Sequence, residues 1–187
     1  MSSKFFNNNS GNTLFEKLKG IACNMANFDR FLAVVGFFRS SGYFKLRKEL
    51  NNVEEIKILV GINIDDIFRR HNKAMLMLEN EEKAKMVYDE EFRQDIINAR
   101  YAPEVEEGIL QMCQDLVDGR LQMKIHATKN LHAKFYLCLP QNHNENSDGW
   151  VIMGSSNISD SGLGTSRSPR YELNVAMKDF DDVDYCH

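Results

Sequence analysis

The sequence predicts an α/β fold, in which helices flank a mixed, largely parallel β-sheet. Two segments are apolar on both faces, as buried strands are: residues 28–38, which read FDRFLAVVGFF, and residues 56–62, which read IKILVGI. A turn at residues 39–42 and a short helix through Leu50 separate them. A strand, a helix and a strand in this order form a βαβ unit, whose strands are normally parallel.

The front of the chain is expected to enter this fold through a helix. Residues 1–12 are polar and rich in Asn, so we expect a flexible arm, and Thr13 can cap a helix over residues 14–26. We expect one domain over residues 13–180. Residues 181–187 are expected to form an acidic tail with no closing element, which in a longer protein leads to further domains.

At about residues 64–118, apolar residues recur at helical spacing among acidic and amide residues, which predicts a helical excursion from the sheet. We expect two helices over residues 65–99 and a third that follows Pro103 and ends at Gly119. Apolar segments then predict further strands, at residues 121–126, 131–139, 150–153 and 171–177.

Composition limits the classes of function. The net charge of −4 disfavours tight non-specific DNA binding, although a local basic patch can serve instead. The four cysteines form no CxxC pair and no close Cys/His cluster, so we expect neither a metal nor another cofactor. Cys23, Cys113 and Cys138 lie in apolar stretches and are expected to be buried free thiols, as in a reducing cytosol. With no apolar signal segment and no membrane-spanning run, we expect a cytoplasmic protein that does not bind membranes.

The strand expected over residues 131–139, LHAKFYLCL, carries the most informative pattern. Because side chains alternate along a strand, His132 and Lys134 share one face with Tyr136, and the first two lie about 7 Å apart. The opposite face is wholly apolar and is expected to lie in the core. An imidazole beside an ammonium fits a phosphate, with the Lys as a fixed positive charge and the His as nucleophile or proton carrier.

The next apolar strand ends in the sequence GSSN, residues 154–157. Gly154 lets the backbone turn sharply, and Ser155 and Asn157 offer a hydroxyl and an amide that can donate to phosphate oxygens. A short loop would bring this strand end back beside His132, so that four groups converge on one anion. The alternative interpretation is a surface His/Lys pair followed by a Ser-rich turn.

A second HxK pattern, His71-Asn72-Lys73, does not share this context. It lies in a helical pattern, where residues two apart point about 200° away from each other, and no GSxN follows it. We therefore do not expect a site there.

HAKFYL followed by GSSNIS, and then by SGLG and YELNV, resembles the phospholipase D superfamily, whose signature is HxK, an optional Asp and then GSxN. The opening segments FLAVVGFFRSSGYFKL and IKILVGI resemble that family's opening strand–helix–strand, and the resemblance covers most of residues 14–178 apart from the excursion. It is closest to the nuclease-like branch, including phospholipase-D-type domains ahead of helicase modules and in restriction endonucleases. The usual Asp is Leu139 here, and Asp148 lies too far along to replace it, which weakens a lipase function more than a nuclease function.

The resemblance implies a mechanism in which two HxK half-sites make one active site. One His attacks phosphorus and forms a phosphohistidine, the other protonates the leaving oxygen and then activates water, and Lys and Asn stabilise the charge on the phosphoryl oxygens without a metal. Because the chain has one such half-site, the resemblance implies a homodimer with a shared site. Glu172, in YELNV, matches a family carboxylate that supports the active-site His by a hydrogen bond. A solvated strand carboxylate is the alternative.

We expect the substrate to be nucleic acid, and DNA before RNA. The candidates for contacts to the nucleic-acid backbone are the basic residues near the expected mouth of the cleft: Arg39, Lys129, Arg167 and Arg170. For each of them the alternative is a solvated charge on a loop. Two other functions stay open, a lipid phosphodiesterase or phosphatidyl transferase, and a non-catalytic module that binds DNA or dimerises. A helicase domain in the same longer chain is a further expected partner.

Overall fold

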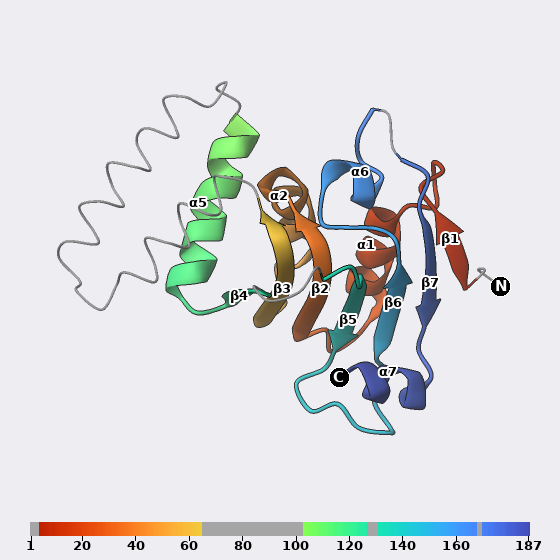
Figure 1. The fold of residues 1–187 in the computed structure, drawn as a ribbon. Coiled ribbons are helices and arrows are strands. Elements are labelled where there is room, and N and C mark those ends of the chain that lie inside the picture. The colour runs from red at the N-terminus through yellow and green to blue at the C-terminus, as the bar shows by residue number, and fades with distance from the viewer. Residues whose placement is uncertain (1–3, 65–102, 127–130, 168–169) are drawn as a thin grey trace.

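A computed structural model describes residues 4–64, 103–126, 131–167 and 170–187 of the chain (Figure 1). The described strands form one seven-stranded sheet in the order β1-β7-β6-β5-β2-β3-β4. The strands are β1 (Phe5–Asn7), β2 (Arg30–Phe38), β3 (Glu55–Ile64), β4 (Leu121–Ile125), β5 (Phe135–Leu139), β6 (Trp150–Gly154) and β7 (Leu173–Met177). The described helices are α1 (Leu14–Asn24), α2 (Ser40–Glu49), α5 (Pro103–Val117), α6 (Asp160–Leu163) and α7 (Phe180–Cys186).

The mixed α/β fold predicted from the sequence is confirmed, but the expectation of a largely parallel sheet is wrong. Strand β2 pairs in parallel with β3, as the βαβ unit predicts, and β3 pairs in parallel with β4. The other described pairs, β2–β5, β5–β6, β6–β7 and β1–β7, are antiparallel. Strands β5 and β6 are joined by residues 140–149, a connection that is too short for the crossover that a parallel pair requires.

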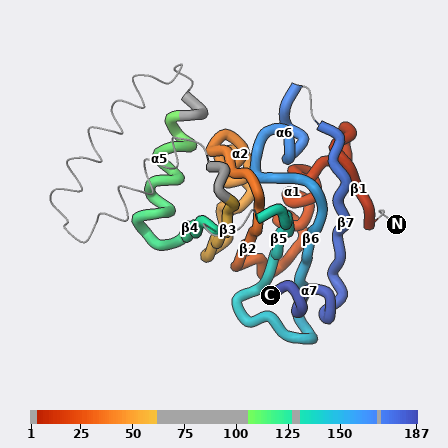
Figure 2. The backbone as a smooth tube through the Cα atoms, in the orientation of Figure 1, coloured from red at the N-terminus to blue at the C-terminus, as the bar shows by residue number. Residues whose placement is uncertain are grey.

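The main core lies between the sheet and the helices α1, α2 and α5, which cover one of its faces (Figures 1 and 2). Helix α1 begins where the sequence predicts: the Thr13 hydroxyl accepts from the Glu16 N–H at 3.1 Å, and the Glu16 carboxylate accepts from the Thr13 N–H at 2.9 Å. The helix then buries Leu14, Leu18 and Ile21 against the sheet.

Both ends of the described chain are more ordered than expected. The arm predicted over residues 1–12 contains β1, which pairs with β7 and buries Phe6. The predicted acidic tail contains α7, which buries Val183 against Leu137 and Val151 on the opposite face of the sheet. Each element is too short for its periodicity to stand out, and α7 is stabilised by aspartates in its first turn, where the helix dipole favours negative charge.

The strand that carries the HxK motif starts later than predicted. Strand β5 begins at Phe135, so His132 and Lys134 precede the strand instead of lying within it. Both faces of β5 are covered: Tyr136 lies in the main core, and Leu137 lies in the second cluster under α7. The prediction that one face of this strand is core and the other carries the site is therefore wrong, because the site lies beyond the strand end.

Part of the predicted excursion is described. Helix α5 follows Pro103 as predicted and buries Ile109 and Met112, and the chain turns at Gly119 with φ +72°. The helices predicted over residues 65–99, and the second HxK pattern within them, lie outside the described residues.

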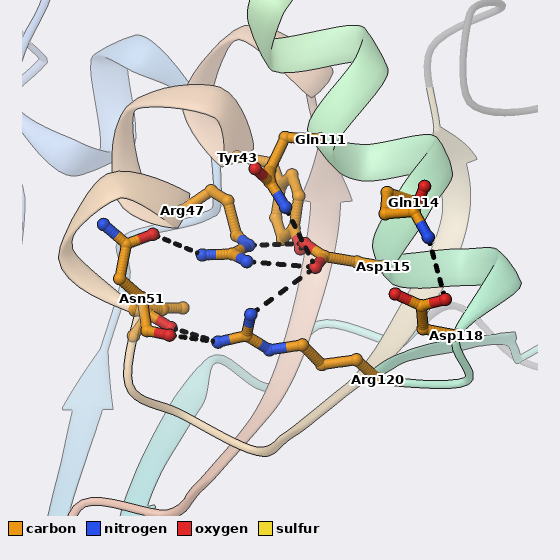
Figure 3. Close-up of polar contacts among 9 residues, drawn as sticks. Tyr43, Arg47, Asn51, Gln111, Gln114, Asp115, Asp118 and Arg120 are labelled. Atoms are coloured by element: carbon orange, nitrogen blue, oxygen red, sulfur yellow. Dashed lines mark hydrogen bonds and ion pairs between the residues drawn. The ribbon is translucent and has the colours of Figure 1, made fainter.

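A buried polar cluster attaches α5 to α2 (Figure 3). The Asp115 carboxylate accepts from both Nε and Nη2 of Arg47, the latter at 3.0 Å, and from the Tyr43 hydroxyl at 3.3 Å. Arg120 Nη1 lies 3.7 Å from Asp115 Oδ1, while its Nη2 donates to the Leu50 carbonyl at 2.7 Å. Burial and the Asp115 charge raise the pKa of Tyr43, which keeps its hydroxyl protonated as a donor. The cluster therefore holds α5 and the start of β4 against α2.

Two of the three thiols predicted to be buried are buried, Cys113 and Cys138, whereas Cys23 is exposed on α1. No described helix is long and apolar enough to cross a membrane.

Candidate functional site

The candidate site lies at the edge of the sheet where β2 and β6 end and where β5 and β7 begin. After β6 the chain crosses this edge toward β2 before it enters α6 (Figure 2). Phe38 and Ile158 form a parallel bridge there, and the Arg39 N–H donates to the Ile158 carbonyl at 2.8 Å. This crossing segment, residues 154–158, is called the GSSN loop below, and it brings Asn157 beside residues 120 positions earlier in the chain.

The side chain of Asn157 is fixed by the backbone of β2. Its Oδ1 accepts from the Phe37 N–H at 2.9 Å, and only the carbonyl oxygen of the amide can accept this bond. The Nδ2 group is therefore the half of the amide that remains available as a donor to a ligand.

Lys134 reaches the same place from the residues before β5. The residue is buried, with 7% of its surface exposed, and its Nζ donates to the His132 carbonyl at 2.6 Å. A Cβ atom placed on Gly36 would lie 3.6 Å from Lys134 Nζ and 3.6 Å from Asn157 Oδ1. The ammonium and the amide therefore converge above a glycine that has no side chain to separate them. Burial lowers the pKa of Lys134, and the negative charge of Glu172 opposes this effect.

His132 is joined to this pair through its backbone, because its carbonyl accepts from Lys134 Nζ, and the residue is exposed to solvent. Its carbonyl is fixed by Lys134, but none of the described residues forms a hydrogen bond with its ring. The sequence-based expectation that Glu172 supports this ring is not what the structure shows.

Glu172 instead accepts a hydrogen bond from the Ser155 hydroxyl. Ser155 Oγ in turn accepts from the Leu173 N–H at 3.1 Å, and the Ser155 N–H donates to the Leu173 carbonyl at 3.2 Å. Because a serine hydroxyl has one hydrogen, Ser155 can donate to a phosphate only after it releases Glu172. The direct donation to an anion that the sequence predicts for Ser155 is therefore not available in this structure, where Ser155 joins the GSSN loop to β7.

A buried layer beneath the site was missed by the sequence reasoning. Tyr136 donates to the Ser156 carbonyl at 2.8 Å, and Asn174 Nδ2 donates to Ser156 Oγ at 2.9 Å. Ser156 is fully buried, and burial together with the Glu172 charge raises the pKa of Tyr136. These bonds join residues about twenty positions apart, and the sequence contains no signal for them beyond the position of Tyr136 on the face of His132.

Two glycines allow the GSSN loop to lie this close to its neighbours. A Cβ on Gly162 in α6 would lie 2.3 Å from the Asn157 carbonyl oxygen, and a Cβ on Gly42 in α2 would lie 2.7 Å from the Ser159 Cα. Ser159 caps α6, as its Oγ accepts from the Gly162 N–H at 3.0 Å. The SGLG sequence after the motif therefore has a steric explanation.

The structure describes three of the four basic residues predicted to contact substrate. Arg39 lies beside the GSSN loop, with its guanidinium over the Phe37 ring at 5.6 Å from the centroid. Arg167 and Arg170 are exposed in the segment between α6 and β7. Lys129 lies outside the described residues.

Neither the position of the missing Asp nor Asp148 is near the site. Leu139 is fully buried at the far end of β5 from Lys134, and Asp148 precedes β6 at that same far edge. Within the described ranges, no three His, Cys, Asp or Glu side chains are grouped so that they could hold a metal ion.

Comparison with known proteins finds a structural likeness but no sequence match. No family model matches the chain, and no curated protein matches it. A crystal structure of the yeast tyrosyl-DNA phosphodiesterase matches with a TM-score of 0.47 and 14% identity, over 92% of this chain and 30% of that one. A point mutant of the same yeast enzyme matches with a TM-score of 0.48 and 14% identity, over 92% and 31% of the two chains. The chain therefore spans less than a third of the length of that enzyme, and the proposed function rests on the side chains of the site.

Proposed function

We propose that this chain is a metal-independent phosphodiesterase that cleaves nucleic acid through a phosphohistidine, with an active site shared across a homodimer. One observation supports this most strongly: the ammonium of the buried Lys134 and the amide of Asn157 converge above Gly36, and the same ammonium bonds to the carbonyl of the exposed His132. Hydrogen-bond donors that converge near a nucleophile favour the binding of an anionic group with an electrophilic atom. A phosphodiester is such a group, because its phosphorus is electrophilic and its oxygens carry negative charge.

Lys134 and Asn157 are arranged to stabilise charge on phosphoryl oxygens. Lys134 Nζ gives one of its three hydrogens to the His132 carbonyl, which leaves two for a ligand. The amide oxygen of Asn157 is held by β2, so its Nδ2 hydrogens need no reorganisation when charge develops. Donors that are fixed before the reaction stabilise a transition state more than donors that must reorient.

In the proposed reaction a ring nitrogen of His132 forms the bond to phosphorus as the bond to the leaving oxygen breaks. The leaving oxygen takes its proton from His132 of the partner subunit. Water then attacks phosphorus, returns a proton to that ring, and releases the first His132. Each step conserves atoms and charge with two imidazoles and water alone. The two His132 copies are equivalent until substrate binds, so neither has a fixed role as nucleophile or acid before that.

An exposed apolar surface supports the homodimer. On the sheet face opposite the main core, Phe5, Val175 and Met153 are cross-strand neighbours on β1, β7 and β6, and Leu173 is close by on β7. Phe5 is 62% exposed, Leu173 52% and Met153 39%. An exposed apolar patch of this kind is typical of an interaction surface, and it lies at the same end of the sheet as the site.

The direct test is incubation with labelled plasmid and oligonucleotides in excess EDTA. We expect cleavage by the wild-type protein and none by His132→Ala, whose exposed side chain makes the fold insensitive to the change. Lys134→Ala is expected to be nearly as damaging.

Other results of the same assay would identify other functions. Cleavage that stops in EDTA would overturn the mechanism. Hydrolysis of phosphatidylcholine but not of oligonucleotides would indicate a lipid phosphodiesterase, and DNA binding without cleavage would indicate a non-catalytic module.

A further inference from the structure

Two exposed aromatic rings lie on opposite sides of the candidate site. Phe37 is 43% exposed at the end of β2, and Tyr171 is 78% exposed just before β7. Both residues are directly linked to residues of the site. The Phe37 N–H donates to Asn157 Oδ1, and Tyr171 directly precedes Glu172, which accepts from the Ser155 hydroxyl. Phe37 and Tyr171 are called the flanking rings below.

In the order of the strands, the candidate site lies between the two flanking rings. Strands β6 and β5, which deliver Ser155 and Lys134, lie between β7 and β2. Three strand spacings of about 4.8 Å place the backbones that carry the rings on the order of 14 Å apart. This is several times the step of about 3.4 Å between stacked nucleotides of one strand, so the two bases that the rings meet are several nucleotides apart, one before and one after the bound phosphate.

Each flanking ring has an arginine next to it. The Arg39 guanidinium lies 5.6 Å from the centroid of the Phe37 ring, and Arg170 directly precedes Tyr171. Aromatic faces interleaved with cations are the combination that binds single strands, because bases stack on the rings while the cations follow the backbone.

We propose that Phe37 and Tyr171 stack on nucleobases on the two sides of the reacting phosphate, and that the substrate is single-stranded nucleic acid. In a duplex the bases stack on each other inside the helix, so the flanking rings could reach them only after unstacking. This inference rests on the proposed phosphodiesterase function and adds to it the strandedness of the substrate and two residues that select it.

The test compares Phe37→Leu, Tyr171→Leu and the double variant with the wild-type protein in EDTA. Leucine removes the ring but keeps an apolar side chain, and the Phe37 N–H still holds Asn157 because it belongs to the backbone. Tyr185→Leu is the matched control, since Tyr185 is 92% exposed on α7 near the opposite end of the sheet.

The probes are a single-stranded oligothymidylate, the matching oligouridylate, a DNA duplex, and an abasic strand of the same length. Loss of one stacked base is expected to weaken binding by roughly 5- to 150-fold. We therefore expect Phe37→Leu and Tyr171→Leu each to lose binding to the single strands by that factor and the double variant to lose more than either, while Tyr185→Leu does not. The abasic strand, which has nothing to stack, is expected to bind all four variants and the wild type equally. The wild type is expected to cleave at least one of the single strands in preference to the duplex.

The inference is overturned if the wild type cleaves nucleic acid through His132 while the double variant binds and cleaves single strands as well as the wild type does. Equal or better cleavage of the duplex would also overturn it. Failure of the proposed function gives a different result, in which the wild type cleaves neither strand nor duplex, and that result removes both claims.

Discussion

The buried cluster around Asp115 allows a quantitative prediction about how the site is supported. The Asp115 side chain is 2% exposed and that of Arg47 is 5% exposed, so neither charge has water to solvate it. Asp115→Ala would leave the Arg47 guanidinium buried with no carboxylate beside it, and the Tyr43 hydroxyl would lose its acceptor.

The expected cost follows from this burial. Removing one partner of a buried, hydrogen-bonded ion pair costs about 3–5 kcal/mol of unfolding free energy, because the other charge is left uncompensated. A domain of this size loses about 2–4 °C of melting temperature per kcal/mol, so we expect Tm to fall by roughly 6–20 °C. Helix α2 also carries Gly42, which lies against Ser159 directly after the GSSN loop, so we expect cleavage to fall with the loss of order in α2.

Thermal and urea unfolding of the variants would measure this cost. Asp118→Ala is the control directly after the same helix, because the Asp118 side chain is exposed and accepts only from Gln114 Nε2 at 2.8 Å among the described residues. We expect the control to change stability by less than about 0.5 kcal/mol. Replacing both charges, with Arg47→Met and Asp115→Leu together, is expected to restore most of the loss. A cost below about 1 kcal/mol for Asp115→Ala, or an equal cost for Asp118→Ala, would refute the reasoning.

Three further predictions concern the site. Gly162→Ala is expected to abolish cleavage by a folded protein, because the added methyl group would lie 2.3 Å from the Asn157 carbonyl oxygen; wild-type turnover by this variant would contradict the steric account. Replacing Arg167 and Arg170 together with Gln is expected to reduce the slope of log affinity against log salt by up to about 2, and an unchanged slope would show that neither contacts phosphate. Burial lowers the pKa of Lys134, so the folded state holds this proton less tightly than the unfolded chain does. The free energy of unfolding of the wild type, relative to that of Lys134→Met, is therefore expected to rise with pH between the lowered pKa of Lys134 in the folded state and its pKa in the unfolded chain. A difference between the two free energies that stays constant over this pH range would contradict the prediction.

The elements that the sequence predicts well are those with long, regular patterns. Strands β2 and β3, which are apolar on both faces, and the parallel pairing between them follow from residues 28–62 alone, as does α1 from the Thr13 cap. Strand β1 and helix α7 were missed because three and seven residues do not establish a periodicity. The return of β6 beside β5 follows from their short connection. The antiparallel pairs β2–β5, β6–β7 and β1–β7 were missed, because they depend on connections whose path the local pattern does not contain.

The candidate site could be located from the sequence but not assembled from it. The HxK and GSSN patterns identify Lys134 and Asn157, and the structure brings these side chains together. The bond that orients Asn157 comes from the Phe37 backbone, 120 residues away, where no side-chain pattern could indicate it. The partner of Glu172 was assigned from the resemblance, whereas the contact in the structure is with Ser155.

The central claim is that His132 becomes bonded to phosphorus during cleavage, in a site built by two chains. The most direct measurement is the mass of the protein after rapid alkaline denaturation during turnover of a labelled oligonucleotide in EDTA, followed by mapping of the modified peptide. The account predicts a nucleotidyl adduct on His132, with at most one adduct for every two chains, and none in His132→Ala. Cleavage by the wild type with no adduct on His132, or an adduct on every chain, would contradict it.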